Sequence, residues 1–156
     1  MATNSVPHFQ EELDQLKARL LEMGGLAEDR VRSAVKALVE RDLALVEHVL
    51  AGDTPINQLH IEIDSRCVKL LALHQPMAVD LRVILSAVKI NTDLERVGDL
   101  AINIAEAAMR YLGHPPVKEL IDIPRMADIA QEMLRDALDA YVRRDIELAH
   151  HVLNEE

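Results

Sequence analysis

The chain has 156 residues and a formal net charge of −10, from 27 acidic and 17 basic side chains. This excess of acids argues against a broad nucleic-acid surface, which requires clustered cations. It favours binding of cations or of basic partners. With one Phe, two Tyr and no Trp, the core must be made of aliphatic side chains, as is common in helical bundles. The single cysteine excludes an internal disulfide and fits a reducing compartment.

The sequence gives no sign of export or of membrane insertion. The N-terminal segment MATNSVPHFQEELDQL lacks the basic and apolar regions of a signal peptide. No apolar run reaches the roughly 18 residues that a membrane span needs. We therefore expect a cytoplasmic protein that is helical throughout.

Apolar residues at helical spacing predict a long first helix and a second helix after it. The first runs from Phe9 to about Arg41 and stays in phase through the pair Gly24–Gly25. Asp42 can cap the second helix. The segment 52–55, GDTP, can bend or break this helix, because proline donates no backbone hydrogen bond.

A third helix is expected to begin near Gln75–Pro76 and to end before 113–116, GHPP, the clearest boundary in the chain. Steps of 100° per residue sort it into two opposed faces. The face expected to close the core carries Val79, Val83, Ile90, Leu94, Val97, Ala101, Ile104 and Ala108. The face expected to point outward carries Leu81, Ile84, Val88, Asn91, Glu95, Asp99, Ile102 and Glu106.

The remaining sequence repeats the beginning of the chain. Helices are expected from about Met126 to Arg143 and from Asp145 onward. Residues 23–53 align without a gap on residues 126–156, at an offset of 103, with 12 identities in 31 positions. This is a duplicated helical unit.

The repeat predicts an all-α protein of tandem three-helix bundles. Residues 8–112 form the first bundle, and residues 117–156 form the first part of a second bundle that is truncated after its second helix begins. The missing part is expected to carry a counterpart of the acidic third helix. Because an unfinished bundle exposes an apolar stripe, we also expect a homodimer or an exchange of helices between copies.

Two polar lines on neighbouring helices form a candidate metal site. Helices two and three should be antiparallel, so both lines can approach one groove of the bundle surface. Carboxylates with one imidazole suit Mg, Mn, Fe or Zn. The lines are Asp53, Asn57, His60 and Asp64 on the second helix, and Asn91, Glu95 and Asp99 on the third.

Other readings of these residues stay open. The acids can instead form a solvated face, in a bundle whose role is structural or that of a metalloenzyme. The pair Glu147 and His150 has the spacing of di-iron ligands, but no second pair accompanies it, so we regard it as coincidence. Cys67 is expected in the core. We expect Arg66, Arg82 and Arg96 to form salt bridges. The sequence contains no arrangement of residues that predicts catalysis, so we expect that the protein is not an enzyme.

Three segments carry a family resemblance. QPMAVDLRVILSAVKINTDLERVGDLAINIAE, preceded by MGGLAEDRVRSAVKAL and by the pattern GDxxxNxxxxxID, closely resembles the PhoU family of bacterial phosphate-signalling regulators. The resemblance extends from about Phe9 to Glu156. It implies two related three-helix bundles and a cytosolic accessory protein that represses the phosphate-starvation response. The implied partners are a sensor histidine kinase and the ATPase subunit of the phosphate ABC transporter.

The resemblance also implies metal-binding E(D)xxxD motifs on the second and third helices. The motif on the third helix corresponds to Glu95 and Asp99, and the motif on the second falls on His60 and Asp64. His60 stands where the family usually has a carboxylate, and an imidazole shifts the preference toward Zn or Fe. The predicted metal ligands are therefore His60, Asp64, Glu95 and Asp99.

Overall fold

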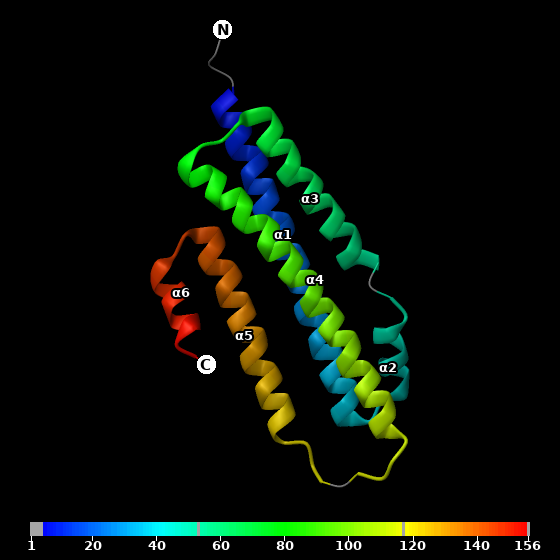
Figure 1. The fold of residues 1–156 in the computed structure, drawn as a ribbon. Coiled ribbons are helices and arrows are strands. Elements are labelled where there is room, and N and C mark those ends of the chain that lie inside the picture. The colour runs from blue at the N-terminus through cyan, green and yellow to red at the C-terminus, as the bar shows by residue number, and fades with distance from the viewer. Residues whose placement is uncertain (1–4, 53, 117, 156) are drawn as a thin grey trace.

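The computed structural model describes residues 5–52, 54–116 and 118–155. These residues form six α-helices and no strand, which confirms the all-helical fold (Figure 1). None of the described helices is both long and apolar enough to cross a membrane. The helices are α1 (Ser5–Glu40), α2 (Leu43–Leu50), α3 (Thr54–His74), α4 (Ala78–Leu112), α5 (Asp122–Arg143) and α6 (Ile146–Leu153).

Helix α1 is the centre of the molecule, because α2, α3, α4 and α5 all pack against it. It runs unbroken through Gly24–Gly25, as predicted. Its buried residues alternate in steps of three and four, which keeps one seam facing its partners along the whole length of the helix. This seam consists of Leu13, Leu16, Leu20, Met23, Ala27, Arg30, Ala34 and Ala37.

The predicted second helix is divided into α2 and α3. Asp42 caps α2 as expected, and its side chain accepts a hydrogen bond of 3.0 Å from the backbone N–H of Leu45. Helix α2 ends at Leu50, and α3 begins at Thr54. Pro55 has no N–H to continue the helical hydrogen bonding, whereas the first turn of a new helix needs none. The break therefore falls in the predicted segment.

Helix α4 begins at Ala78, slightly later than predicted, and its buried seam is rotated from the predicted one. Ile84 and Asn91, expected to face outward, are buried, and Val79, expected in the core, is 56% exposed. The buried residues again follow a seven-residue repeat, and an ideal helix drifts by about 20° per heptad from such a repeat. The seam consists of Ile84, Ala87, Asn91, Leu94, Gly98, Ala101, Ala105 and Ala108.

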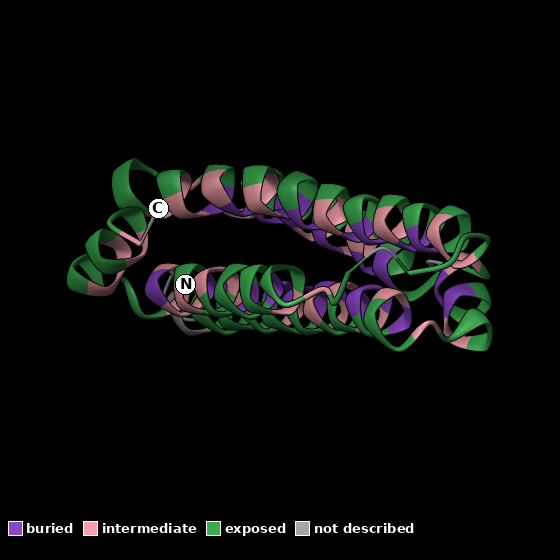
Figure 2. Cartoon of the chain, turned by 90° about the horizontal axis from the view of Figure 1, so that it is seen from below, coloured by how far each residue is buried: buried purple, intermediate pink, exposed green. Residues whose placement is uncertain are grey.

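The core has two parts. In the larger part, leucine-rich segments of α1, α3 and α4 meet, together with Leu138 of α5. The smaller part lies where α1, α2 and α4 meet and contains mostly alanine, which lets the helices approach closely. Figure 2 shows the buried residues facing inward between the helices. The smaller cluster consists of Ala34, Ala37, Val46, Val49, Ala101, Ala105 and Ala108.

Helix α5 packs against α1 in the opposite direction, and α6 folds back beside it (Figure 1). Leu138 lies directly against Gly24, and Arg135 pairs with Glu28. The hydroxyl of Tyr141 donates a hydrogen bond of 2.7 Å to the backbone carbonyl of Val83 in α4. The start of the second predicted unit thus shares the core of the first.

Candidate functional site

The polar line that was predicted on α4 leaves the core as it runs along the helix. Asn91 is 1% exposed, Glu95 is half-buried, and Asp99 is exposed. Residues four apart advance 40° per turn, so such a line rotates away from the buried seam. On α3, His60 is half-buried and Asp64 is exposed.

One hydrogen bond fixes how α3 and α4 align. The side-chain amide of Asn91 donates to the backbone carbonyl of His60 at 2.9 Å, so these two residues are level. Because the helices are antiparallel (Figure 1), Glu95 is level with about position 56. At about 1.5 Å per residue, Asp64 lies about 12 Å from Glu95 and about 18 Å from Asp99 along the bundle.

These distances do not let the four predicted ligands hold one ion together. Within residues 5–52, 54–116 and 118–155, no three His, Cys, Asp or Glu side chains gather closely enough to hold a metal. Nδ1 of His60 is buried and has no hydrogen-bond partner, so this nitrogen does not face the surface groove. Asp53, on the predicted polar line of the second helix, lies outside the described residues. Cation binding by His60, Asp64, Glu95 and Asp99 stays a prediction.

The residues named beside these ligands are placed as follows. Cys67 is buried, and burial raises the pKa of its thiol to about 11, so it is the expected core residue. Arg66 and Arg96 pair with Glu62 and Asp93, as predicted. Arg82 lines a groove between α4 and α5. Glu147 and His150 are both exposed on α6.

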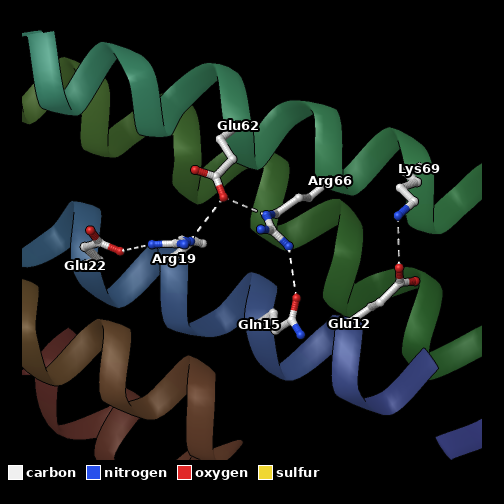
Figure 3. Close-up of polar contacts among 7 residues, drawn as sticks. All are labelled: Glu12, Gln15, Arg19, Glu22, Glu62, Arg66 and Lys69. Carbon is white, nitrogen blue, oxygen red and sulfur yellow. Dashed lines mark hydrogen bonds and ion pairs between the residues drawn. The ribbon is translucent and has the colours of Figure 1, made fainter. Parts of the chain in front are cut away.

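A charged surface between α1 and α3 was not predicted as a site. Figure 3 shows Glu62 of α3 between two arginines: Arg19 of α1 at 3.1 Å and Arg66 of α3 at 2.8 Å. Arg66 also donates to the side chain of Gln15 at 3.2 Å. Arg19 pairs in addition with Glu22 on its own helix, and this hydrogen bond raises the pKa of Arg19. The signal in the sequence was the spacing of four between Glu62 and Arg66.

Glu12 continues this surface toward the end of the bundle. It accepts hydrogen bonds from Lys69 at 3.2 Å and from His74 at 2.8 Å, and its side chain is 14% exposed. The pKa of Glu12 is held below its ordinary value mainly by the hydrogen bond to His74 and, after it, by the hydrogen bond to Lys69. The ring of Phe9 lies 5.0 Å from that of His74. Together these contacts join the start of α1 to the end of α3.

The charged surface borders a groove of about 480 Å³, lined by Glu12, Glu62, Arg66 and Lys69 among others. Its charges are held on two packed helices and are mostly paired with each other. Such a surface can bind a partner that offers both acids and bases, because the partner's groups can enter existing ion pairs.

Comparisons with known proteins point to one family. The PhoU domain model matches residues 20–108 and 123–156. The chain is 37% identical over 146 residues to the phosphate-specific transport system accessory protein PhoU homolog of Aquifex aeolicus. It is 43% identical over 143 residues to the homolog of Pseudomonas putida. These matches cover 94% and 90% of this chain, but only 66% and 56% of the two relatives.

Solved structures show the same fold. The crystal structure of PhoU from Pseudomonas aeruginosa superimposes with a TM-score of 0.85 at 39% identity, over 92% of this chain and 69% of that one. The phosphate transport system regulatory protein PhoU from Streptococcus pneumoniae gives a TM-score of 0.82 at 30% identity, over 92% and 68%. On sequence and structure together, the chain belongs to the PhoU family.

Proposed function

We propose that the chain is a cytoplasmic regulator of phosphate uptake and of phosphate-starvation signalling, and not an enzyme. The observation that carries this proposal is the identity of 37% and 43% to accessory proteins of phosphate-specific transport systems. The chain spans between about half and two thirds of the length of these relatives. The activity of a whole relative is therefore carried over here as a proposal.

The regulator acts by contact with a sensor histidine kinase and with the ATPase subunit of a phosphate ABC transporter. Contact alone does not regulate: the chain must bind one conformation of the kinase more tightly than the other. We assign the contact to the charged surface of α1 and α3, because its acids and bases stand at fixed positions on packed helices. Charges held in this way set partner choice and orientation.

The kinase contact is tested by co-purification. The purified chain is mixed with the tagged cytoplasmic part of the kinase, and separately with the transporter ATPase. We expect both to retain the wild-type chain, and the Arg66→Ala variant to be retained several-fold less. Arg96→Ala is the matched control, because Arg96 forms an exposed pair with Asp93 on α4, outside the charged surface of α1 and α3, and should not affect binding.

A second test follows signalling in cells. In a strain that lacks its own PhoU protein, expression of the chain should repress a phosphate-starvation reporter when phosphate is abundant. Unchanged reporter activity, together with no retention by either partner, would exclude the proposed function.

Cation binding is a separate proposal, and nothing above depends on it. The donors present on α3 and α4 suit Zn, Fe, Mn or Mg, but they do not form a complete site as they lie. Elemental analysis of the purified protein tests it. Metal that is bound by the wild type should be lost from a variant with alanine at Asp64, Glu95 and Asp99. Equal metal content in both proteins would reject these ligands.

A further inference from the structure

The outward face of α4 carries a row of cations. The buried seam of this helix repeats every seven residues, through Ile84, Asn91, Gly98 and Ala105. Positions five residues after these point away from the core, because each residue turns by 100° around the helix axis. Continued back by one repeat, these outermost positions are Arg82, Lys89, Arg96, Asn103 and Arg110, and all five are exposed.

The charge of this row is opposite to that of the chain. The chain has a net charge of −10, whereas four of the five outermost positions of α4 are basic and none is acidic. Arg96 pairs with Asp93 at 3.3 Å. Within residues 5–52, 54–116 and 118–155, Arg82, Lys89 and Arg110 form no ion pair. Three cations of the row can therefore pair with another molecule.

The spacing of the row matches that of a second helix. Seven residues are about 10.5 Å along a helix, so the row from Arg82 to Arg110 is about 42 Å long. Two helices packed side by side share a seven-residue repeat, and charges beside their contact pair at that interval. A partner helix with an acid at every seventh position can thus place one carboxylate at each cation. Asn103, within the row, can donate a hydrogen bond to a carboxylate as well.

Acids beside the row disfavour a continuous polyanion as its partner. Asp93, Asp99 and Glu106 lie on the same helix, each within four residues of a cation of the row. Their charges would repel phosphates that repeat closely along a nucleic acid or a polyphosphate. A helix with well-separated carboxylates can reach the cations and leave these acids in water.

Exposed leucines border the row on both sides. Leu85 follows Arg82 by three residues, and Leu100 follows Arg96 by four, so the two leucines lie on opposite sides of the row. They are 47% and 57% exposed. A partner helix that pairs with the cations can cover these side chains with apolar residues of its own, which adds hydrophobic burial to the ion pairs.

We propose that this row is a docking site for one α-helix of a partner protein. The partner helix carries aspartate or glutamate at every seventh position and apolar residues between them. It lies along α4, where its carboxylates pair with the cations of the row and its apolar residues cover Leu85 and Leu100. The docking does not depend on the proposed role in phosphate signalling, whose contact is assigned to α1 and α3.

The probe is a synthetic helix-forming peptide of about 28 residues, long enough to lie beside the whole row. It carries glutamate at every seventh position, one leucine between successive glutamates, and alanine or glutamine elsewhere. Its binding to the intact protein is measured by fluorescence anisotropy at about 0.15 M salt, which screens charges that are not in close contact. We expect saturable binding of one peptide per chain.

Substitutions in the row test the contact. Lys89→Glu should weaken binding at least tenfold, because attraction in the middle of the row becomes repulsion. Arg82→Gln should weaken it about threefold, the effect of one lost exposed ion pair. Lys36→Glu is the matched control, because it makes the same change of charge at an exposed lysine of α1 and should bind like the wild type. Circular dichroism checks that each variant folds.

The proposal is overturned by absent binding, or by undiminished binding to both Lys89→Glu and Arg82→Gln. Equal binding of a peptide that has the same composition but irregularly spaced glutamates also overturns it, because the row then attracts negative charge without recognising a helix. Heparin that displaces the peptide at equal charge concentration would assign the row to a continuous polyanion instead.

Discussion

Asn91 places an amide inside the buried seam of α4. Its nitrogen donates to the carbonyl of His60, but its oxygen is buried without a partner. An unsatisfied buried polar atom costs stability, whereas a polar residue at a seam position can fix the register of packed helices. We infer that Asn91 holds α4 level with His60 at the expense of stability.

Replacing Asn91 tests this cost. Asn91→Leu keeps a similar volume and removes the unpaired oxygen, so the free energy of unfolding should rise by about 1 kcal/mol. Asn91→Asp places a charge in the same position and should lower it by on the order of 3 kcal/mol at neutral pH. Urea denaturation measures both. A Leu variant that is less stable than the wild type would contradict the inference.

Glu12 makes stability depend on pH. Its pKa is held below the ordinary value of 4.5, chiefly by the hydrogen bond to His74. A lowered carboxyl pKa contributes stability above pH 4.5, and this stability is lost as the pH falls through the lowered value.

Glu12→Gln tests this dependence. The wild type should be more stable than Glu12→Gln near pH 6, and the difference between the two should shrink as the pH falls below 4.5. Thermal unfolding at several pH values measures it. Glu11→Gln, at an exposed neighbouring position, should follow the wild type at every pH. A constant difference between wild type and Glu12→Gln would contradict the expected role.

Single residues were predictable where spacing within one helix decides their surroundings. The cap at Asp42, the buried Cys67 and the pair of Arg66 with Glu62 all follow from local sequence. The contacts of Glu12 with Lys69 and His74 join segments far apart in the chain, so no local pattern revealed them. Which of the predicted metal ligands lie close together depends on how α3 and α4 align. The hydrogen bond from Asn91 to His60 fixes this alignment, and no pattern within one helix reveals it.

Among the elements, α1 shows how one dipeptide can have two roles. A Cβ added at Gly24 would overlap Leu138, whereas one added at Gly25 would meet nothing within 4 Å. Gly24 is thus required for the close approach of α5, and Gly25 only weakens the helix.

The two glycines give a paired prediction. Gly25→Ala should raise the free energy of unfolding by about 1 kcal/mol, because alanine has the higher helix propensity. Gly24→Ala gains the same propensity but displaces Leu138, so it should be less stable than Gly25→Ala. Chemical denaturation of both variants measures the difference. Equal stabilisation by the two substitutions would show that α5 does not pack at Gly24.

The helices themselves were predictable because apolar spacing, caps and prolines act locally. The division of the second helix at Pro55 and the end of α4 before Gly113 fall where the sequence indicated. The orientation of α4 was not predictable from an ideal helix, since long helices packed side by side follow a 3.5-residue spacing. The predicted metal ligands depended on this orientation. The predicted core face of α4 was wrong because it was drawn for an ideal helix.

At the scale of the molecule, one buried leucine joins α5 to the core of the first three-helix unit. Leu138 is 6% exposed and belongs to the larger core cluster. Leu138→Ala should therefore lower the free energy of unfolding by about 2 to 4 kcal/mol and expose α5 to protease. Ile129→Ala, at a position that is 40% exposed on the same helix, should change both much less. Limited proteolysis with urea denaturation compares the two variants.

The contacts between α1 and α5 obey a local two-fold symmetry. Gly24 meets Leu138, and their counterparts in the repeat, Ala127 and Val35, border one common cavity. Glu28 pairs with Arg135, and the repeat counterparts of these two residues are Gln131 and Arg32. Both counterparts also border that cavity. The two copies thus face each other as the subunits of a symmetric dimer do, here joined by one peptide. A substitution that improves packing between α1 and α5 at one position should therefore also improve it at the counterpart of that position, 103 residues away.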